Sequence, residues 1–448
     1  MRETRNAQPS IFDRYAKHEM GSELAMMSAL LDHCPRLVEL VEADLVDGQA
    51  QQTGRAGMPV ESVLRCAVLK QSRQLSYHEL AFYLEDSSSF RSFARLPQGA
   101  VPKKSALQAN IRRVQPETWE RINQALVKGA LSSGLESGEQ VRIDSTAVKT
   151  NVHEPSDSSL LCDGIRMLSR QMVKARQSLK VPGICFTDRR KAARSLARQV
   201  FYTRGIPKKK PLYEVLLAYS EQVLEESRVA LTKVERLQHE GPEYAQWAWQ
   251  VAHLRDLLGR VIQQTRRRVI DGESVPSPEK LVSLHEPHTD IIVKGNRDVQ
   301  YGHKINLTTG LQGLVLDATI ESGNPGDMVR YLPMIERQAD LYGGTPVAVA
   351  ADGGYASQPN LEGAKALGVI DVAFQKKKGL TVEAMTSTPA QYQRLCDFRA
   401  GIESNISELK RAYGLKRSLW RGLKGFMAEV WSAIFSYNLV KMARLAAT

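Results

Sequence analysis

Three acidic residues stand where folding could bring carboxylates together. Asp144 lies in an alternating segment, Asp352 directly follows a run of small apolar residues, and Glu403 lies in a long segment with helical spacing. Separations of 208 and 51 residues mean that only the fold can join them. Carboxylates are ligands that Mg²⁺ prefers, and two such ions about 4 Å apart stabilise both oxygens of an in-line phosphoryl transfer. The acids therefore predict metal-dependent phosphoryl transfer.

Each acid also has a simpler explanation. An aspartate followed by Gly-Gly, like Asp352, commonly closes a turn. A glutamate with Arg399 and Lys410 at helical spacing commonly belongs to a solvated salt-bridge face. Asp144, followed by Ser-Thr, can be a satisfied polar residue at a strand end. The catalytic hypothesis therefore depends on the elements that carry the three acids.

Those elements follow a recognisable order. Alternation over 140–148 predicts a strand with Asp144 on one face, and residues 301–310 and 314–320 predict a hairpin. A buried strand within 345–355 reaches Asp352. Further segments complete the pattern: helices at 328–343, 360–368 and 389–414, and a strand at 369–374. Three strands followed by strands joined through helices are the order of a ribonuclease H-like (RNase H-like) α/β core.

A long helical region separates the first two strands. Leu161, Ile165, Leu168 and Met172 form a coiled-coil-like seam, and helical spacing continues over 212–240 and 243–269. Residues 271–280, with a glycine and two prolines, are typical of a linker. We therefore expect the core to be split by a large helical insertion. The predicted parts are 1–135, 136–160, 161–285 and 286–448, in which 136–160 and 286–448 form the core.

Residues 1–135 predict an all-α N-terminal DNA-binding domain. Pro59 suits the first turn of one helix, and Ser76 with Glu79 has the spacing of a capping box. Short helices with tight links suit a helix-turn-helix-like reader of DNA. Its candidate cations are Arg65, Lys70, Arg73 and Arg91.

The charge of the chain favours a nucleic-acid partner. The 448 residues carry a formal net charge of +12, and residues 166–210 hold 14 Lys or Arg against one acid, Asp188. The alternative is a basic enzyme without a nucleic-acid partner. It would explain the overall charge but not the concentration of cations in one stretch. Cations on this stretch and near Glu403 are expected to bind DNA phosphate, and Trp420 to stack on an unpaired base. The candidates are Arg189, Arg190, Lys208, Lys209, Lys210, Lys304, Arg399, Lys410, Lys416, Arg417 and Trp420.

Other features bear on location. No apolar run suggests a membrane helix, and the N-terminus has no apolar segment typical of a secretory signal. The five cysteines are scattered without a CxxC pair, which argues against a zinc site and suits a reducing compartment. We expect a cytoplasmic, nucleoid-associated protein.

Several blocks of the sequence resemble bacterial insertion-sequence DDE transposases, most closely the ISNCY-type group. They are GRAGMPVESVLRCAVLKQSRQLSYHELAFYLED, RIDSTAVKTNVHEPSDSSLLCDGIR, LHEPHTDIIVKGNRDVQYGHKINLTTG, SGNPGD, VAADGGYAS and FRAGIESNISELKRAYGLKRSLWRGL. The family's three acids fall on Asp144, Asp352 and Glu403. Related enzymes carry Tyr-x2-Arg-x3-Glu-x6-Lys around the third acid; Arg399, Glu403 and Lys410 fit, but Cys396 takes the tyrosine position.

The resemblance implies a function in detail. It implies binding of terminal inverted repeats in double-stranded DNA, cleavage, and joining to target DNA, with two Mg²⁺ ions (or Mn²⁺) per site and a homodimer or larger synaptic complex. Two alternatives stay open: an RNase H-like structure-specific nuclease or resolvase, and a domesticated, non-catalytic DNA-binding protein. The sequence does not give the repeat sequence, the target preference, the choice between hairpin and copy-out routes, or whether the element is active.

Overall fold

The computed structural model describes residue 4 and residues 15–46, 57–96, 99, 101–293 and 299–446. Parts of two blocks quoted above, 54–56 and 294–298, lie outside this range. The chain divides into two compact units: a first unit of residues 1–151 and 303–448, and a second unit of residues 152–302. Each is described by itself. No helix in the described ranges has the length and apolar character needed to cross a membrane.

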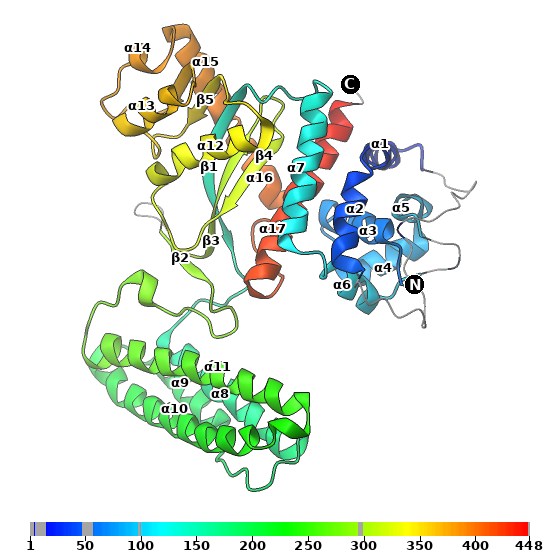
Figure 1. Cartoon of the computed structure of the whole chain (residues 1–448). Helices are drawn as coiled ribbons and strands as arrows, with labels where there is room; N and C mark the ends of the chain where they lie inside the picture. The colour runs from blue at the N-terminus through cyan, green and yellow to red at the C-terminus, as the bar shows by residue number, and fades with distance from the viewer. Residues whose placement is uncertain are drawn as a thin grey trace. The chain divides into compact units, whose positions relative to one another are not determined.

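A mixed sheet forms the centre of the first unit (Figure 1). Its middle strand, β1 (Gln140–Lys149), lies between β3 (Gln300–Thr309) and β5 (Ala348–Ala351). β4 (Val315–Ile320) pairs antiparallel with β3, and β6 (Asp371–Phe374) pairs parallel with β5, as β5 does with β1. The order β4-β3-β1-β5-β6 is that expected of an RNase H-like core. The strand positions predicted from alternation are confirmed, with ends shifted by a few residues.

Helices follow the strands in the predicted order, with one correction. The segment 389–414 is two helices, because the predicted long helix is interrupted at Gly401. The Phe398 carbonyl accepts hydrogen bonds from Arg142 Nη1 at 2.7 Å and from the Gly401 N–H at 3.1 Å. The helices after β4 are η4 (Asp327–Arg330), α12 (Tyr331–Tyr342), α13 (Gln358–Ala366), α14 (Val382–Met385), α15 (Pro389–Ala400), α16 (Ile402–Ala412) and α17 (Gly422–Leu445).

The N-terminal part of the first unit is helical. The predicted capping box is confirmed, since Ser76 and Glu79 exchange both hydrogen bonds at the start of α4. Pro59 precedes its helix as the N-cap instead of lying in the first turn. The helices are α1 (Glu19–His33), α2 (Arg36–Leu45), α3 (Val60–Ser72), α4 (Tyr77–Asp86), α5 (Ser88–Ala94), α6 (Lys104–Ile111) and α7 (Pro116–Ser132).

One predicted DNA-contacting residue of this part is instead structural. The Arg65 side chain is fully buried and pairs with Glu61 at 3.0 Å and Asp32 at 2.8 Å. A buried guanidinium needs such partners, so its role is to join α3 to α1. Arg73 is likewise paired, with Glu23 at 2.9 Å. The expectation that Arg65 reads DNA was wrong.

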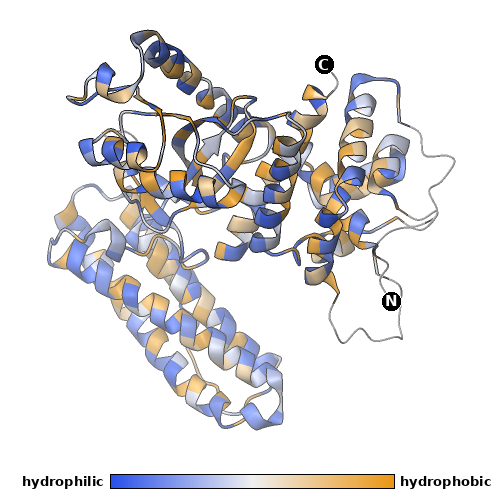
Figure 2. Cartoon of the chain, turned by 45° about the horizontal axis from the view of Figure 1, so that its top comes forward, coloured by the Kyte–Doolittle hydropathy of each residue, from blue (hydrophilic) through white to orange (hydrophobic). Residues whose placement is uncertain are grey.

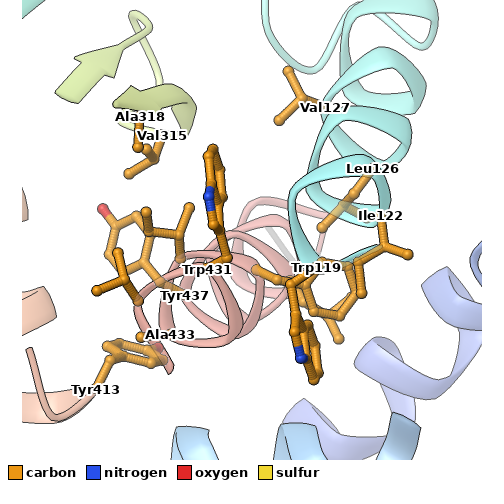
Figure 3. Close-up of a cluster of buried hydrophobic side chains, with 14 of the residues drawn as sticks. Trp119, Ile122, Leu126, Val127, Val315, Ala318, Tyr413, Trp431, Ala433 and Tyr437 are labelled. Atoms are coloured by element: carbon orange, nitrogen blue, oxygen red, sulfur yellow. The ribbon is translucent and has the colours of Figure 1, made fainter. Parts of the chain in front are cut away.

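Helices α7 and α17 pack against each other and against β4. Figure 3 shows Trp119, Ile122 and Leu126 of α7 near Trp431 and Tyr437 of α17. All five side chains are buried, and α17 is apolar around most of its circumference. A helix of this kind must lie inside a core, which explains why the C-terminal segment is central to the first unit.

The second unit contains four long helices with a core of their own. Leu161, Ile165, Leu168 and Met172 are buried along the predicted seam. Polar residues alternate with apolar ones along these helices (Figure 2), as expected where one face is buried. The elements are α8 (Asp157–Gln177), α9 (Arg190–Tyr202), α10 (Ile206–Glu235), η1 (Gln238–Glu240), α11 (Pro242–Thr265), η2 (Arg266–Ile270), η3 (Ser277–Glu279) and β2 (Asp290–Ile292), which pairs with residues 300–302.

Candidate active site

The three acids lie around one guanidinium group. Arg399 Nη2 is 3.0 Å from Asp144 Oδ2 and 3.9 Å from Asp352 Oδ1, and its Nη1 is 2.8 Å from Glu403 Oε1. The Arg399 side chain is buried, whereas the Glu403 side chain is 68% exposed and that of Asp352 42%. The structure therefore brings together three carboxylates that are remote in sequence, and the site opens to solvent on the side of Glu403.

Strand geometry places the two aspartates. Asp144 lies within β1, and Asp352 follows the last residue of the adjacent parallel strand β5. Each aspartate accepts the N–H of the next residue at 2.7 Å, which fixes the carboxylate orientation. Gly353 allows the chain after Asp352 to pass close to Lys376, because a Cβ there would lie 2.5 Å from Lys376 Cβ. Because Ile143 pairs with Ala351 in the parallel register, the next residues, Asp144 and Asp352, lie side by side where β5 ends.

Arg142 places the third acid. This buried side chain of β1 donates to Thr309 Oγ1 at 3.0 Å, to the Phe398 carbonyl at 2.7 Å and to Asn405 Oδ1 at 2.6 Å. The last two acceptors belong to α15 and α16, so one guanidinium fixes both helices to the sheet. Burial lowers the pKa of Arg142, and the charges of Tyr437 and Glu136 act in the opposite direction. Sequence reasoning missed this residue, because its partners are up to 263 residues away.

Tyr355 is a second residue that sequence reasoning missed. Its buried hydroxyl lies 3.4 Å from Asn306 Oδ1 of β3. Burial raises the pKa of Tyr355, and the charges of Asp327 and Asp144 raise it further, so the phenol stays neutral beside the acids. The signal was present in the block ADGGY, whose tyrosine follows Asp352 by three residues.

Two family models match the chain. One, described as a transposase DDE domain, matches residues 262–439, and the other, described as a transposase domain (DUF772), matches residues 12–113. The chain is an insertion-sequence DDE transposase. No curated protein and no solved structure matches it.

The family settles the class of reaction. DDE transposases cleave DNA and transfer the cut strand to a new site, and they use a divalent metal, typically Mg²⁺. The matched DDE region contains Asp352 and Glu403 and ends within α17, while Asp144 lies before it. These findings favour a transposase over the nuclease, the resolvase and the non-catalytic DNA-binding protein that the sequence left open.

The acids of the transposase suit a hard divalent cation in their chemistry. The donor set consists of carboxylate oxygens, without thiolate or imidazole. Within the described ranges, no three His, Cys, Asp or Glu side chains are close enough together to ligate a single ion. The three carboxylates instead surround the guanidinium of Arg399. Their arrangement therefore already binds one positive charge, that of a side chain.

Two predicted DNA-binding residues of the transposase need correction. Lys304 is 4% exposed; its Nζ donates to the Pro325 carbonyl at 2.7 Å and pairs with Asp327 at 2.5 Å. It holds the segment after β4 and does not face a phosphate. Trp420 is buried, with Lys70 and Arg112 near its ring at 5.9 and 5.6 Å. Cations therefore contact this ring, and it is not free to stack on a base.

The remaining predicted cations lie on both units. Lys410, Lys416 and Arg417 line one groove of the first unit. In the second unit some are already paired: Arg189 with Glu226 at 2.8 Å and Arg190 with Asp188 at 2.6 Å. Lys210 Nζ donates to the Ile270 carbonyl at 2.6 Å, whereas Lys208 is exposed and Lys209 half-buried. Their contact with DNA stays a prediction.

Cys396 stands where related enzymes have a tyrosine, and Tyr392 lies one helical turn before it. Tyr392 of α15 donates its hydroxyl to the Phe374 carbonyl at the end of β6, at 2.9 Å. This phenol fastens α15 to the sheet and is occupied by that bond. It therefore does not replace a tyrosine at position 396.

Proposed function

We propose that Asp144, Asp352 and Glu403 hold two divalent ions, Mg²⁺ or Mn²⁺, and that the transposase cuts and joins DNA beside them. The observation that carries this proposal is the convergence of the three carboxylates on the Arg399 guanidinium, each within 3.9 Å. When bound, such ions stabilise the attacking and leaving oxygens of an in-line displacement at phosphorus.

The chain's own residues supply orientation and charge. Arg399 balances the acids and keeps three carboxylates near one point despite their mutual repulsion. Lys410 follows Glu403 by seven residues, two helical turns, so it lies on the same face of α16 and can bind a phosphate beside the reacting one. Exposure of Glu403 leaves that side open to DNA.

The partners follow from the same proposal. The substrates are terminal inverted repeats and target DNA, the N-terminal helices read the repeats, and the basic stretch 166–210 contacts phosphates. A homodimer or larger complex brings the two ends of the element together. Within the insertion-sequence transposases, the chain belongs to the ISNCY-type group. Support for these partners comes from the charge of the chain and from the match to residues 12–113.

Isosteric variants of the acids test the proposal. Asp144→Asn, Asp352→Asn and Glu403→Gln should each abolish cleavage and strand transfer of an end-bearing duplex in Mg²⁺, while binding of that duplex persists. Asp397→Asn is the matched control, because Asp397 is an exposed acid on α15 close to Arg399 in sequence. Cleavage by any of the three variants at the wild-type rate would refute the assignment of that acid.

A further inference from the structure

A basic groove of about 1340 Å³ lies in the first unit, between the N-terminal helices and the segment from α16 to α17. Among the described residues, eight cations line it, against two acids, Glu79 and Glu429. The cations come from both walls: Lys70, Arg112, Lys149, Lys410, Arg411, Lys416, Arg417 and Arg421. A concave surface with this charge concentrates an anion.

The two acids of the groove are engaged elsewhere. Glu79 caps the start of α4 by accepting the Ser76 N–H at 2.7 Å. Glu429 is buried, and its Oε2 accepts from Ser418 Oγ and from the N–H groups of Leu419 and Trp420, at 2.6 to 2.9 Å. Glu429 thereby shapes the loop that carries the cations, and the groove keeps a strong positive surplus.

Aromatic rings hold part of the groove in place. Arg112 and Lys70 lie near the Trp420 ring, and Lys70 also lies 5.0 Å from the centre of the Tyr77 ring. Burial lowers the pKa of Lys70; the charge of Glu429 raises it and that of Arg112 lowers it, so a bound anion would stabilise the ammonium form further. These cations are therefore pre-positioned, which reduces the entropy lost on binding.

Hydrogen bonds to backbone carbonyls join the two walls of the groove. Gln71 of α3 donates to the Tyr413 carbonyl at 2.6 Å, and Gln74 donates to the Arg411 carbonyl at 2.5 Å. The Ser418 N–H donates to the Lys149 carbonyl at the end of β1, at 2.7 Å. The N-terminal helices and the catalytic core thus present one continuous basic surface.

That surface lies close to the acids along two elements. Lys410 is two turns of α16 beyond Glu403, about 10 Å at 1.5 Å per residue. Lys149 is five residues beyond Asp144 on β1, about 16 Å of extended strand. Both distances are short enough for one stretch of DNA to occupy the groove and the acid site together.

We propose that this groove binds the sugar–phosphate backbone of the DNA next to the phosphate that is cut. Cations of the N-terminal helices and of the catalytic core contact the same duplex, so the helical part positions DNA for cleavage as well as reading it. The inference rests on the proposed function of the acids and adds four residues to the DNA-binding candidates, Arg112, Lys149, Arg411 and Arg421. The alternative occupant is an acidic segment of a second copy.

Binding measured without cleavage tests the groove. Arg112→Gln and Arg421→Gln each remove one cation, from opposite walls, and a fluorescein-labelled duplex of random sequence is titrated over a NaCl series in EDTA. Each variant should weaken binding, and the slope of log K against log salt should fall by about 0.9 for each phosphate that is no longer neutralised. Lys128→Gln, exposed on α7 outside the groove, is the matched control and should behave as wild type.

The outcomes are separable. Wild-type affinity and slope in Arg112→Gln would overturn the shared groove, even where Arg421→Gln is impaired. A changed sedimentation coefficient of the DNA-free variants, with unchanged DNA binding, would assign the groove to a second copy and overturn the proposal. Arg421 is exposed, so its variant reports on the groove even where Arg112→Gln unfolds. Asp144→Asn should bind the duplex normally, so failure of the acid assignment would leave this test intact.

Discussion

Arg142 and Gly401 depend on each other at the centre of the active site. A Cβ on residue 401 would lie 2.3 Å from Arg142 Nη1, so any side chain there displaces the guanidinium. The backbone of Gly401 is ordinary helical, with φ −64°, so the requirement for glycine is one of space. The pair thus sets where α15 ends and where α16, which carries Glu403 in its first turn, begins.

Substitution of this pair should change cleavage more than DNA binding. Gly401→Ala should lower the cleavage rate, because a shifted Arg142 releases Phe398 and Asn405 and moves Glu403 away from the other acids. Arg142→Met should do the same and lower the free energy of unfolding by about 2–4 kcal/mol, since buried acceptors lose their donor.

The double variant Arg142→Met/Gly401→Ala distinguishes the steric effect of a Cβ at residue 401 from the loss of the guanidinium at residue 142. Methionine leaves room for the Cβ, so the two losses should not add, and a cycle of rates and unfolding free energies measures the coupling. Gly129→Ala is the matched control, since a Cβ on that helical glycine meets nothing within 4 Å. Additive losses in the cycle would contradict the shared volume.

At the scale of elements, the sequence predicts what adjacent residues determine, but not what contacts between remote residues determine. The strands were predictable because alternation in β1 and the apolar run of β5 are properties of adjacent residues. The interruption at Gly401 was not, because the side chain that takes the Phe398 carbonyl comes from 256 residues away. The burial of Lys304 and Trp420 was missed for the same reason: their partners lie on other elements. The approach of the acids was predictable from the strand order, but the guanidinium between them was not.

Asn438 on α17 shows how a helix can complete a sheet. Its side chain accepts the Val315 N–H at 2.8 Å and donates to the Val315 carbonyl at 2.7 Å. The same amide donates to Asn123 of α7 at 2.8 Å. Both backbone groups of a buried β4 residue are satisfied in this way, so the amide replaces a neighbouring strand.

Asn438→Leu should therefore destabilise the first unit. Two buried backbone groups would lose their partner, which costs about 2–4 kcal/mol in unfolding free energy. Urea denaturation followed by fluorescence measures this loss, because Trp119, Trp420 and Trp431 lie in the first unit; Trp247 and Trp249 report on the second unit, whose transition should stay unchanged. Gln124→Leu on α7 is the matched amide control, because Gln124 is only half-buried and bonds a side chain. Equal stability of both variants would show that Val315 finds another partner.

At the scale of the whole molecule, the largest hydrophobic clusters of the described residues lie in different units. The core of the first unit combines the N-terminal helices, the sheet and α17, so segments from both ends of the sequence share it. The core of the second unit draws only on residues between Leu160 and Leu284. The second unit is inserted between β1 and β3 and has its own core. Such an insertion does not need to change the register of either strand.

Residues 152–302 should consequently fold as a separate fragment. Trp247 is fully buried, and its Nε1–H donates to the Gln171 carbonyl at 2.9 Å, whereas Trp249 is 70% exposed. In a fragment with Trp249→Phe, the remaining indole should emit at short wavelength and shift to long wavelength in one cooperative thermal transition, together with the loss of helical circular dichroism. Val251→Asp places a carboxylate in the buried core and should abolish that transition. Gradual melting of the parent fragment, with long-wavelength emission throughout, would mean that the second unit requires the first in order to fold.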